Sequence, residues 1–400
     1  MDRKRLEGYR REIRAQLGSC IDFWLKNGMD AECGGVLTCL DRTGNVFASD
    51  KSVWMQGRCG WTFARLCALY GKREEWLRAS KSCIDFIEAH CVNHAAGGRL
   101  YFTVTREGKP LRQRRYCFSE GFAMMANAEY AALTGDEACL ARARKYYDMV
   151  WHLNNGGEDP VGMGAKTDPE TRPARALADP MIYLNMTSVM RRCDAEKRAL
   201  YDERARACVS AIGLHIKPEL GCTLETVRPD GQTMTDCVAG RVVNPGHDIE
   251  CAWFLLEQAA YAKDPSILET AKNMFDMAVK MGWDEEYQGL FYFVDALGHP
   301  PEAYEHDMKL WWPHTEMLIA SLMLYRDTGD ETYAQWFHRA WEYSMRVFPD
   351  RDYGEWYGYL RRDGNPTLPA CKGSTYKGPF HYPRMLMMVD QLLGELLAKA

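Results

Sequence analysis

The chain has 400 residues, of which 46% are hydrophobic and 12% aromatic, enough for a large buried core. Lys and Arg number 50 against 55 Asp and Glu, with both signs interspersed and no long basic run, so nucleic acid is not an expected partner. The charged segment 1–17 and the lack of a long apolar run predict a protein without an export signal or membrane span. We expect a cytoplasmic protein whose fifteen cysteines, none in a CxxC pair, stay reduced.

The first predicted element is an amphipathic helix over residues 5–27. Beyond it, apolar helical stretches are separated by short turns at steps of 64, 59, 70 and 65 residues. In these turns a Gly ends one helix or an Asp caps the next. The turns lie at Gly71, Gly135, Asp194, Asp264 and Gly329. The chain therefore repeats a helical hairpin.

A second series of segments alternates with these hairpins. Each is a short run of alternating apolar and polar residues that ends in a turn glycine, as in GGRLYFTVTREGKPL, and predicts a β-hairpin-like excursion after the second helix of a unit. The segments span 34–47, 97–111, 221–234, 288–301 and 353–367. In the third unit a loop, 155–173, takes the place of the hairpin.

Residue types suited to chemistry recur at the start of the first helix of each unit, at spacings of 62, 65, 62, 67 and 67 residues. They are Arg58, Glu120, Asn185, His247, His314 and His381. Six such units fill the chain, and helix 5–27 is left to partner the last helix, 382–398. We therefore predict an all-α fold with a single domain over residues 1–400: a closed, double-layered α/α barrel, or toroid, of six hairpins, with the excursions on the active-site rim. An open solenoid of helix pairs is the alternative.

The three rim histidines share a sequence context. His247, His314 and His381 each lie next to a proline where an apolar helical period begins, which places them at helix N-termini. The helix dipole disfavours imidazolium there, so we expect neutral rings that can accept a proton. Any one of them alone could simply cap its helix. Three on one rim, together with Arg58, favour a catalytic interpretation.

Epimerisation beside a carbonyl needs two acid/base groups that flank one carbon and a cation or donor for the developing enediolate oxygen. Arg58 is the only basic residue among the six rim positions and suits the second role. Glu250 lies three residues after His247 on the same helical face, where it can orient the imidazole or bind a sugar hydroxyl. Glu316 lies beside a helix start, where capping is an equal explanation. Aromatic side chains that could face a sugar ring, although most should be core, are Trp54, Trp253, Trp311, Trp312, Phe118 and Phe380.

Two motifs are rejected. Cys91 and His94, in CVNH, lack a second ligand pair at metal-site spacing, so no metal site is predicted. VGMGAKT resembles a phosphate-binding loop, but Pro160 and Ala165 stand where its glycines belong.

Seven strings, in order along residues 50–388, closely resemble the N-acylglucosamine 2-epimerase family, also called renin-binding protein in mammals. They are VWMQGR (53–58), FSEGFAMMA (118–126), VNPGHDIECAWFLL (243–256), GWDEEYQGLFYFVDA (282–296), MKLWWPHTEMLIA (308–320), YGEWYGYLRRDG (353–364) and KGPFHYPR (377–384). The resemblance implies the six-hairpin α/α barrel and the interconversion of N-acetylglucosamine and N-acetylmannosamine in sialic acid or amino-sugar metabolism.

The same resemblance implies roles for particular residues. His247 and His381 match the two histidines that act on opposite faces of C2, and Arg58 completes the expected catalytic set. The positions that match or are expected to line the substrate pocket are Asn185, Glu250, Glu316, His314, Glu120, Trp311 and Trp54. No cofactor is needed for the chemistry. Mammalian members use ATP as an activator, for which the loop 162–167 is the place to look although it departs from their pattern, and many members are homodimers.

Two other functions remain open from the sequence. One is an aldose-ketose isomerase or a 2-epimerase of unacylated sugars on the same barrel, because one base can form the enediol and return the proton to C1. The other is a non-catalytic protein-binding barrel. Retention of both rim histidines, Arg58 and the pocket carboxylates disfavours the second.

Overall fold

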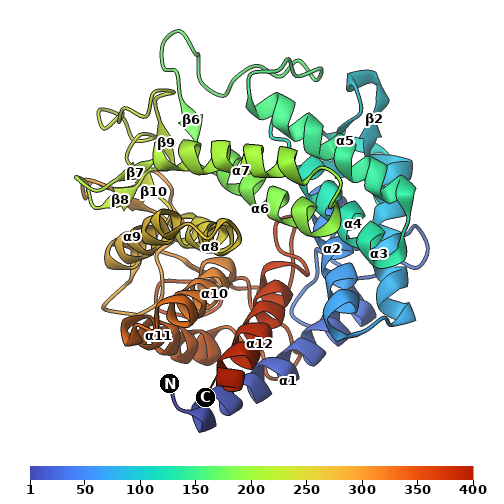
Figure 1. The fold of residues 1–400 in the computed structure, drawn as a ribbon. Coiled ribbons are helices and arrows are strands. Elements are labelled where there is room, and N and C mark those ends of the chain that lie inside the picture. Colours follow the sequence, from blue (N-terminus) through green and yellow to red (C-terminus); the bar gives the residue numbers. More distant parts are fainter. Residues whose placement is uncertain (400) are drawn as a thin grey trace.

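Twelve α-helices alternate between an inner and an outer layer in residues 1–399, which the computed structural model describes (Figure 1). The inner helices are α2 (Val53–Tyr70), α4 (Phe118–Thr134), α6 (Ala178–Cys193), α8 (Pro245–Ala262), α10 (Trp311–Thr328) and α12 (His381–Lys399). The outer helices are α1 (Arg3–Asn27), α3 (Glu74–Phe86), α5 (Glu137–Asn154), α7 (Arg198–Gly213), α9 (Pro265–Gly282) and α11 (Glu331–Val347). None of the helices within residues 1–399 combines the length and apolarity needed to cross a membrane.

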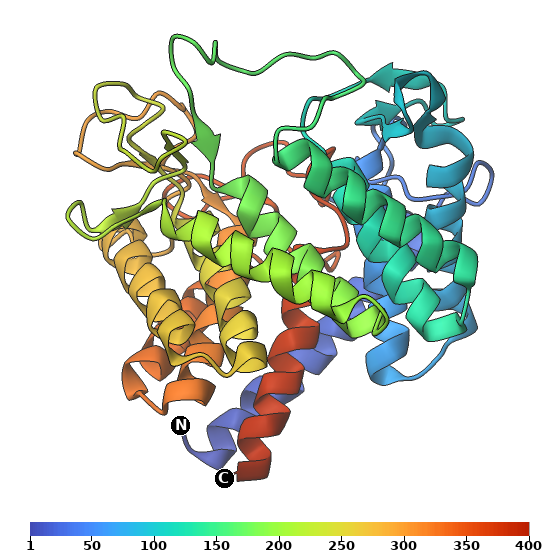
Figure 2. The same cartoon turned by 45° about the horizontal axis from the view of Figure 1, so that its top comes forward.

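The inner helices form a closed ring. Each contacts the next along the chain, and α12 contacts α2, while every outer helix packs on its own inner partner. Helix α1 is the outer partner of α12 and lies beside it in both views (Figures 1 and 2). The predicted closed barrel is thereby confirmed, and the open solenoid is wrong.

The two layers have different burial patterns, as the sequence periodicity requires. Every residue of α10 from Trp311 to Leu324 is buried, because an inner helix is covered both by the ring and by its outer partner. Helix α11 instead buries Tyr333, Phe337, Ala340 and Tyr343, spaced three or four residues apart on one face.

The predicted helix-to-helix turns are also confirmed. Gly71, Gly135 and Gly329 end α2, α4 and α10 with φ of 93°, 80° and 71°, a region that glycine enters without a Cβ clash. Asp136 and Asp330 cap the outer helices that follow, each accepting a hydrogen bond from a backbone N–H of the first turn.

Short antiparallel strands gather at one end of the ring (Figure 2). In four units, the strand just before the inner helix pairs with a strand after the outer helix of the same unit. These pairs are β1 (Lys51–Ser52) with β4 (Thr103–Val104), β6 (Arg175–Ala176) with β9 (Thr226–Val227), β10 (Val242–Val243) with β11 (Val294–Asp295), and β12 (Lys309–Leu310) with β13 (Tyr359–Leu360). Strand β5 (Pro110–Arg112) extends the first pair, and β2 (Val92–Asn93) with β3 (Arg99–Leu100) and β7 (Ile216–Lys217) with β8 (Cys222–Thr223) form small hairpins. The excursions therefore fold back over the N-terminal ends of the inner helices.

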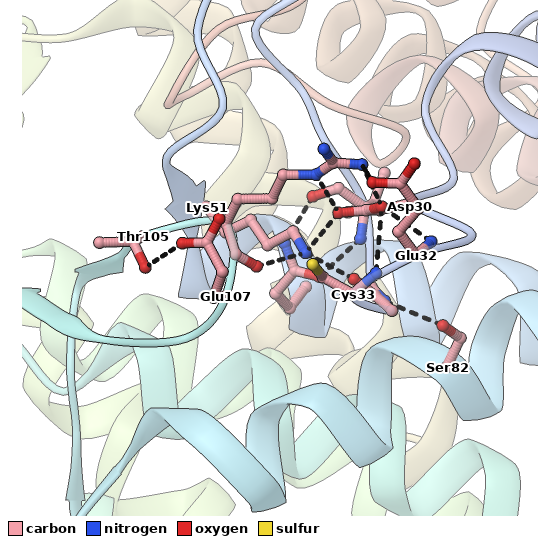
Figure 3. Close-up of polar contacts among 12 residues, drawn as sticks. Asp30, Glu32, Cys33, Lys51, Ser82, Thr105 and Glu107 are labelled. Carbon is pink, nitrogen blue, oxygen red and sulfur yellow. Dashed lines mark hydrogen bonds and ion pairs between the residues drawn. The ribbon is translucent and has the colours of Figure 1, made fainter.

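Buried ion pairs join neighbouring excursions along this rim. Asp30, which follows α1, accepts hydrogen bonds from the N–H groups of Glu32 and Cys33 (Figure 3). Its carboxylate also pairs with Lys51 at 2.9 Å, both side chains being fully buried, and with Arg106 at 2.8 Å. Removing one partner of such a pair leaves an uncompensated charge and costs roughly 3–5 kcal/mol. The pair thus anchors the entry to α2.

The same arrangement recurs twice. Asp284 pairs with Lys309, just before α10, and with Arg362, which follows β13. Asp350 pairs with Lys372 before α12 and with Arg42, which follows α1. This last cluster links the final excursion of the chain to the first one, and so closes the rim as α1 and α12 close the helical layers.

Candidate active site

A cavity of about 560 Å³ opens among the N-terminal ends of the inner helices, under the excursions. Its walls are largely aromatic, with Trp54, Phe118, Phe122, Tyr292, Trp311, Trp312, Tyr359 and Tyr376. Its charged or titratable lining consists of Arg58, His247, Glu250, Glu305 and His381, in addition to the tyrosines. A few polar groups in an otherwise apolar concave site are typical of a small-molecule pocket.

His381 begins α12, and its ring is held by a carboxylate of α10. Its Nδ1 lies 2.8 Å from Oε1 of Glu316 and 3.2 Å from Nη2 of Arg384. The other ring nitrogen, Nε2, has no hydrogen-bond partner in residues 1–399 and remains for a substrate. Burial, and then the positive charges of Arg58 and Arg384, lower the pKa of His381 well below its ordinary value. The ring is therefore neutral near pH 7 and can accept a proton.

His247 lies in the first turn of α8 and faces the same cavity. Its Nδ1 is 2.9 Å from Oε1 of Glu225, on the segment between β8 and β9. Burial alone would lower the pKa of His247, but the charge and hydrogen bond of Glu225 outweigh it, so the pKa is raised. For His247 the shift is thus opposite to the one expected from the helix dipole, because the charge of a carboxylate from another segment acts on the ring.

One indole connects the two histidines. The ring of Trp312 lies 5.1 Å from the His247 ring and 5.8 Å from the His381 ring, measured between centroids. The two imidazoles, from α8 and α12, thus border the same small volume. Their environments shift the pKa values in opposite directions, which is the arrangement expected of an acid and a base.

Arg384 contacts Glu250, Glu316 and His381, three side chains whose ligand atoms are close enough together to hold a metal ion. The ligand atoms of Glu250, Glu316 and His381 lie within 4.8 Å of one another. Nη2 of Arg384 is 2.6 Å from Glu250 and 2.8 Å from Glu316, as well as near His381. Glu316 accepts a further hydrogen bond from Nε1 of Trp253 at 2.8 Å. We call Glu250, which lines the cavity, and the linked residues Glu316, Arg384 and Trp253 behind it the cavity floor.

Arg58 lines the cavity and, within residues 1–399, forms no ion pair with a carboxylate. Its guanidinium makes no hydrogen bond or ion pair to the part of the chain that the structure describes, and its buried Nε is unpartnered. It lies instead against ring faces, 4.1 Å from the centroid of Phe122 and 4.7 Å from that of Phe380. Burial lowers the pKa of Arg58 to about 9, so it stays charged at pH 7. Its donors are free for an oxygen of a bound ligand.

The structure brings six of the ten predicted site residues to the cavity wall. They are Arg58, His247, Glu250, His381, Trp54 and Trp311. Glu316 is fully buried behind His381, which it holds in place. Asn185, two turns into α6, lines a second cavity of about 540 Å³ further down the ring, on the other side of Arg384.

The placement of His314 does not agree with a substrate-binding role. Its ring is fully buried, with Nδ1 at 2.7 Å from the carbonyl of Leu310 and Nε2 accepting from the N–H of Leu290. Gln56 does the same in the first unit, where its side chain bonds the backbone of Val36. Both residues tie an excursion to an inner helix. Burial lowers the pKa of His314 to about 3.

Glu120 is likewise placed away from the cavity. It is fully buried and accepts hydrogen bonds from Nε of Arg99 and the N–H of Leu100, at 2.6 and 2.7 Å. Its partners belong to β3, so its carboxylate fixes the excursion that follows α3 rather than a ligand.

Sequence reasoning missed Arg384 and Glu225. For Arg384 a signal existed, because His381 and Arg384 repeat the three-residue spacing of His247 and Glu250 at the start of an inner helix. For Glu225 the only signal was a carboxylate among the apolar residues of a rim excursion, which does not reveal its partner.

Asp248, next to His247, is a buried carboxyl without a hydrogen-bond partner. It is 1% exposed, and neither oxygen bonds to any group in residues 1–399. Burial, followed by the negative charge of Glu225, raises its pKa well above the ordinary value. The folded chain therefore holds a proton that the unfolded chain loses above about pH 4, so stability falls as pH rises towards the folded pKa.

We expect Asp248→Asn to be more stable than the parent protein at pH 8, with a difference that shrinks towards pH 4. The slope approaches about 1.4 kcal/mol per pH unit where only the unfolded form is ionised. Denaturant unfolding at pH 4, 6 and 8 measures it, with the exposed Asp22→Asn as control. Parallel pH dependences for the parent and Asp248→Asn would contradict the assignment.

Comparison with known proteins agrees with this fold. The family model for N-acylglucosamine 2-epimerase matches residues 35–377. The N-acylglucosamine 2-epimerase of Rattus norvegicus is 37% identical over 100% of this chain and 95% of its own length. The solved cellobiose 2-epimerase of Spirochaeta thermophila superposes with a TM-score of 0.83 at 21% identity, covering 98% of both chains. A solved D-mannose isomerase does so with 0.81 at 21% identity, covering 95% of this chain and 97% of its own.

Proposed function

Because the chain belongs to the N-acylglucosamine 2-epimerase family, and is thus a carbohydrate 2-epimerase, we propose that it interconverts N-acetylglucosamine and N-acetylmannosamine. The proposal rests on one observation. The imidazoles of His247 and His381 both lie against the indole of Trp312, and the same cavity is lined by Arg58, which has no hydrogen bond or ion pair within residues 1–399. Two acid/base groups and one free cation are what a C2 epimerisation requires.

The chemistry follows from the free atoms of these three residues. In the open-chain sugar, Nε2 of one histidine removes the proton from C2, and the electron pair moves into the C1 carbonyl to give an enolate that keeps the acetamido group on C2. Arg58 donates to the developing negative oxygen, where a preorganised cation in a largely apolar cavity is most effective. The second histidine then delivers a proton to the opposite face of C2, which inverts it.

Incubation in heavy water tests the reaction. Starting from either N-acetyl sugar, we expect both epimers to appear with deuterium at C2 and the acetamido group retained, as followed by NMR. Ketose formation from unacylated glucose or mannose, without exchange in the N-acetyl sugars, would instead indicate an aldose-ketose isomerase. An absence of exchange in every sugar would contradict the proposal.

The remaining expectations concern setting and partners. A cytoplasmic setting is supported by fifteen cysteines that are all free, and a role in amino-sugar or sialic acid metabolism remains a prediction. An ATP activator and a homodimer remain predictions. Residues 162–167, where we expect the nucleotide, form an exposed segment of the loop after α5.

A further inference from the structure

The two catalytic histidines have carboxylate partners of different effective charge. Glu316, which holds His381, is neutralised by Arg384 at 2.8 Å and also accepts from Trp253. The side chain of Glu225 has no partner other than His247 among the described residues. A full negative charge therefore lies against one imidazole, while the other faces a carboxylate that is already paired.

The other charges around the rings strengthen this difference. His381 faces the cations Arg58 of α2 and Arg384 of its own helix, together with its partner Glu316 of α10 and with Glu250 and His247 of α8. The groups that face His247 are Glu225, Glu250 of its own helix, Glu316 of α10 and His381 of α12. Two cations thus offset the two carboxylates around His381, whereas no cation is among the groups named around His247.

The backbone holds Glu225 firmly at the rim. Its N–H donates to the carbonyl of Val242 in β10, at 3.0 Å, and its carbonyl accepts from the N–H of Leu177 at 2.9 Å. These bonds tie it to the entry strand of α8 and to the residue before α6. Its titratable neighbours are the buried Asp248 and His215, and Arg175 of β6 lies nearby. The carboxylate is therefore presented to Nδ1 of His247 by a fixed segment.

We propose that Glu225 is the positioning residue that keeps His247 protonated, with its Nε2–H turned to the substrate, so that the resting enzyme holds its acid on α8 and its base on α12. The inference rests on the proposed function. In one turnover the C2 proton goes to Nε2 of His381, the enolate holds the electron pair, and Nε2 of His247 gives its proton to C2. The enzyme is left with the opposite protonation states, which exchange with water or reverse turnover restores.

Glu225→Gln tests the assignment through the pH profile of kcat/KM for epimerisation. Glutamine keeps the size and a hydrogen bond but not the charge, so His247 loses its proton at lower pH. We expect the descending limb to move to lower pH, with activity reduced on the order of 10- to 100-fold at pH 8 and less at pH 6. Glu219→Gln, an exposed carboxylate of the preceding turn, should match the parent protein. An unchanged profile, or a loss equal at all pH values, would overturn the proposal.

A second measurement does not depend on activity. Histidine-selective ¹⁵N NMR, with the His247 signal assigned by its absence in His247→Gln, reports the tautomer and pKa of that ring. We expect the pKa of His247 to lie above the ordinary histidine value in the parent protein and to fall in Glu225→Gln. Equal pKa values in the two would overturn the role of Glu225. If the parent protein epimerises no sugar, the proposed function fails, and this titration still decides the role of Glu225.

Discussion

His381→Ala is expected to lower kcat for 2-epimerisation by about 10²- to 10⁴-fold, the range contributed by a general acid/base group. His381 is the only residue of α12 among those that line the cavity, and its Nε2 has no hydrogen-bond partner in residues 1–399, so water would have to replace it. His338→Ala, a half-buried histidine on the outer helix α11, serves as the control and should retain full activity.

Exchange in heavy water sharpens this test. With His381 absent, His247 should still exchange the C2 proton of the epimer whose hydrogen faces α8, without interconversion. His247→Ala should show the opposite selectivity. Both variants are checked for an unchanged helical CD spectrum. Interconversion that persists in both variants would remove the two histidines from the reaction.

Arg58→Met is expected to lower kcat by about 10²- to 10³-fold with little change in KM. Its guanidinium makes no hydrogen bond or ion pair within residues 1–399, and the missing contact is to an oxygen that becomes charged only in the transition state. Arg58→Lys should recover part of the loss, since the charge returns without the planar fork.

The matched control is Arg65→Met, two turns further along the same helix. Arg65 pairs with Glu129 and lines the second cavity instead of the first. Arg65→Met should therefore keep the parent kcat. A loss as large as that of Arg58→Met would show that the effect comes from altered packing of α2 and not from the missing oxygen contact.

The fold was predictable because its signals are local and repeated. Gly135 and Asp136 end one helix and begin the next through their own backbone and side-chain geometry, whatever surrounds them. Ring closure followed from counting units, since helix 5–27 had no other partner. The pairing of β1 with β4 was not foreseen, because it joins the two ends of one unit across two intervening helices.

The site was predictable only in part, because a residue's position on a helix does not fix its partner. His314 and His381 share a proline-flanked helix start, yet one bonds the backbone of an excursion and the other lines the cavity. His381 is the first residue of α12 whereas His314 is the fourth of α10, and the shared sequence context does not reveal this difference. The charge of His247 depends on Glu225, 22 residues away along the chain.

Arg384 has a consequence for the durability of the cavity floor. Its guanidinium sits among Glu250, Glu316 and His381, where a dissociable ion would be subject to chelation, dilution or replacement by a competitor. The guanidinium of Arg384 is covalently part of α12, so it cannot be removed by chelation, lost on dilution or replaced by another ion. The two carboxylates keep their counter-charge for as long as the first turn of that helix stays wound, so loss of the helix and loss of the electrostatic setting of His381 should be one event.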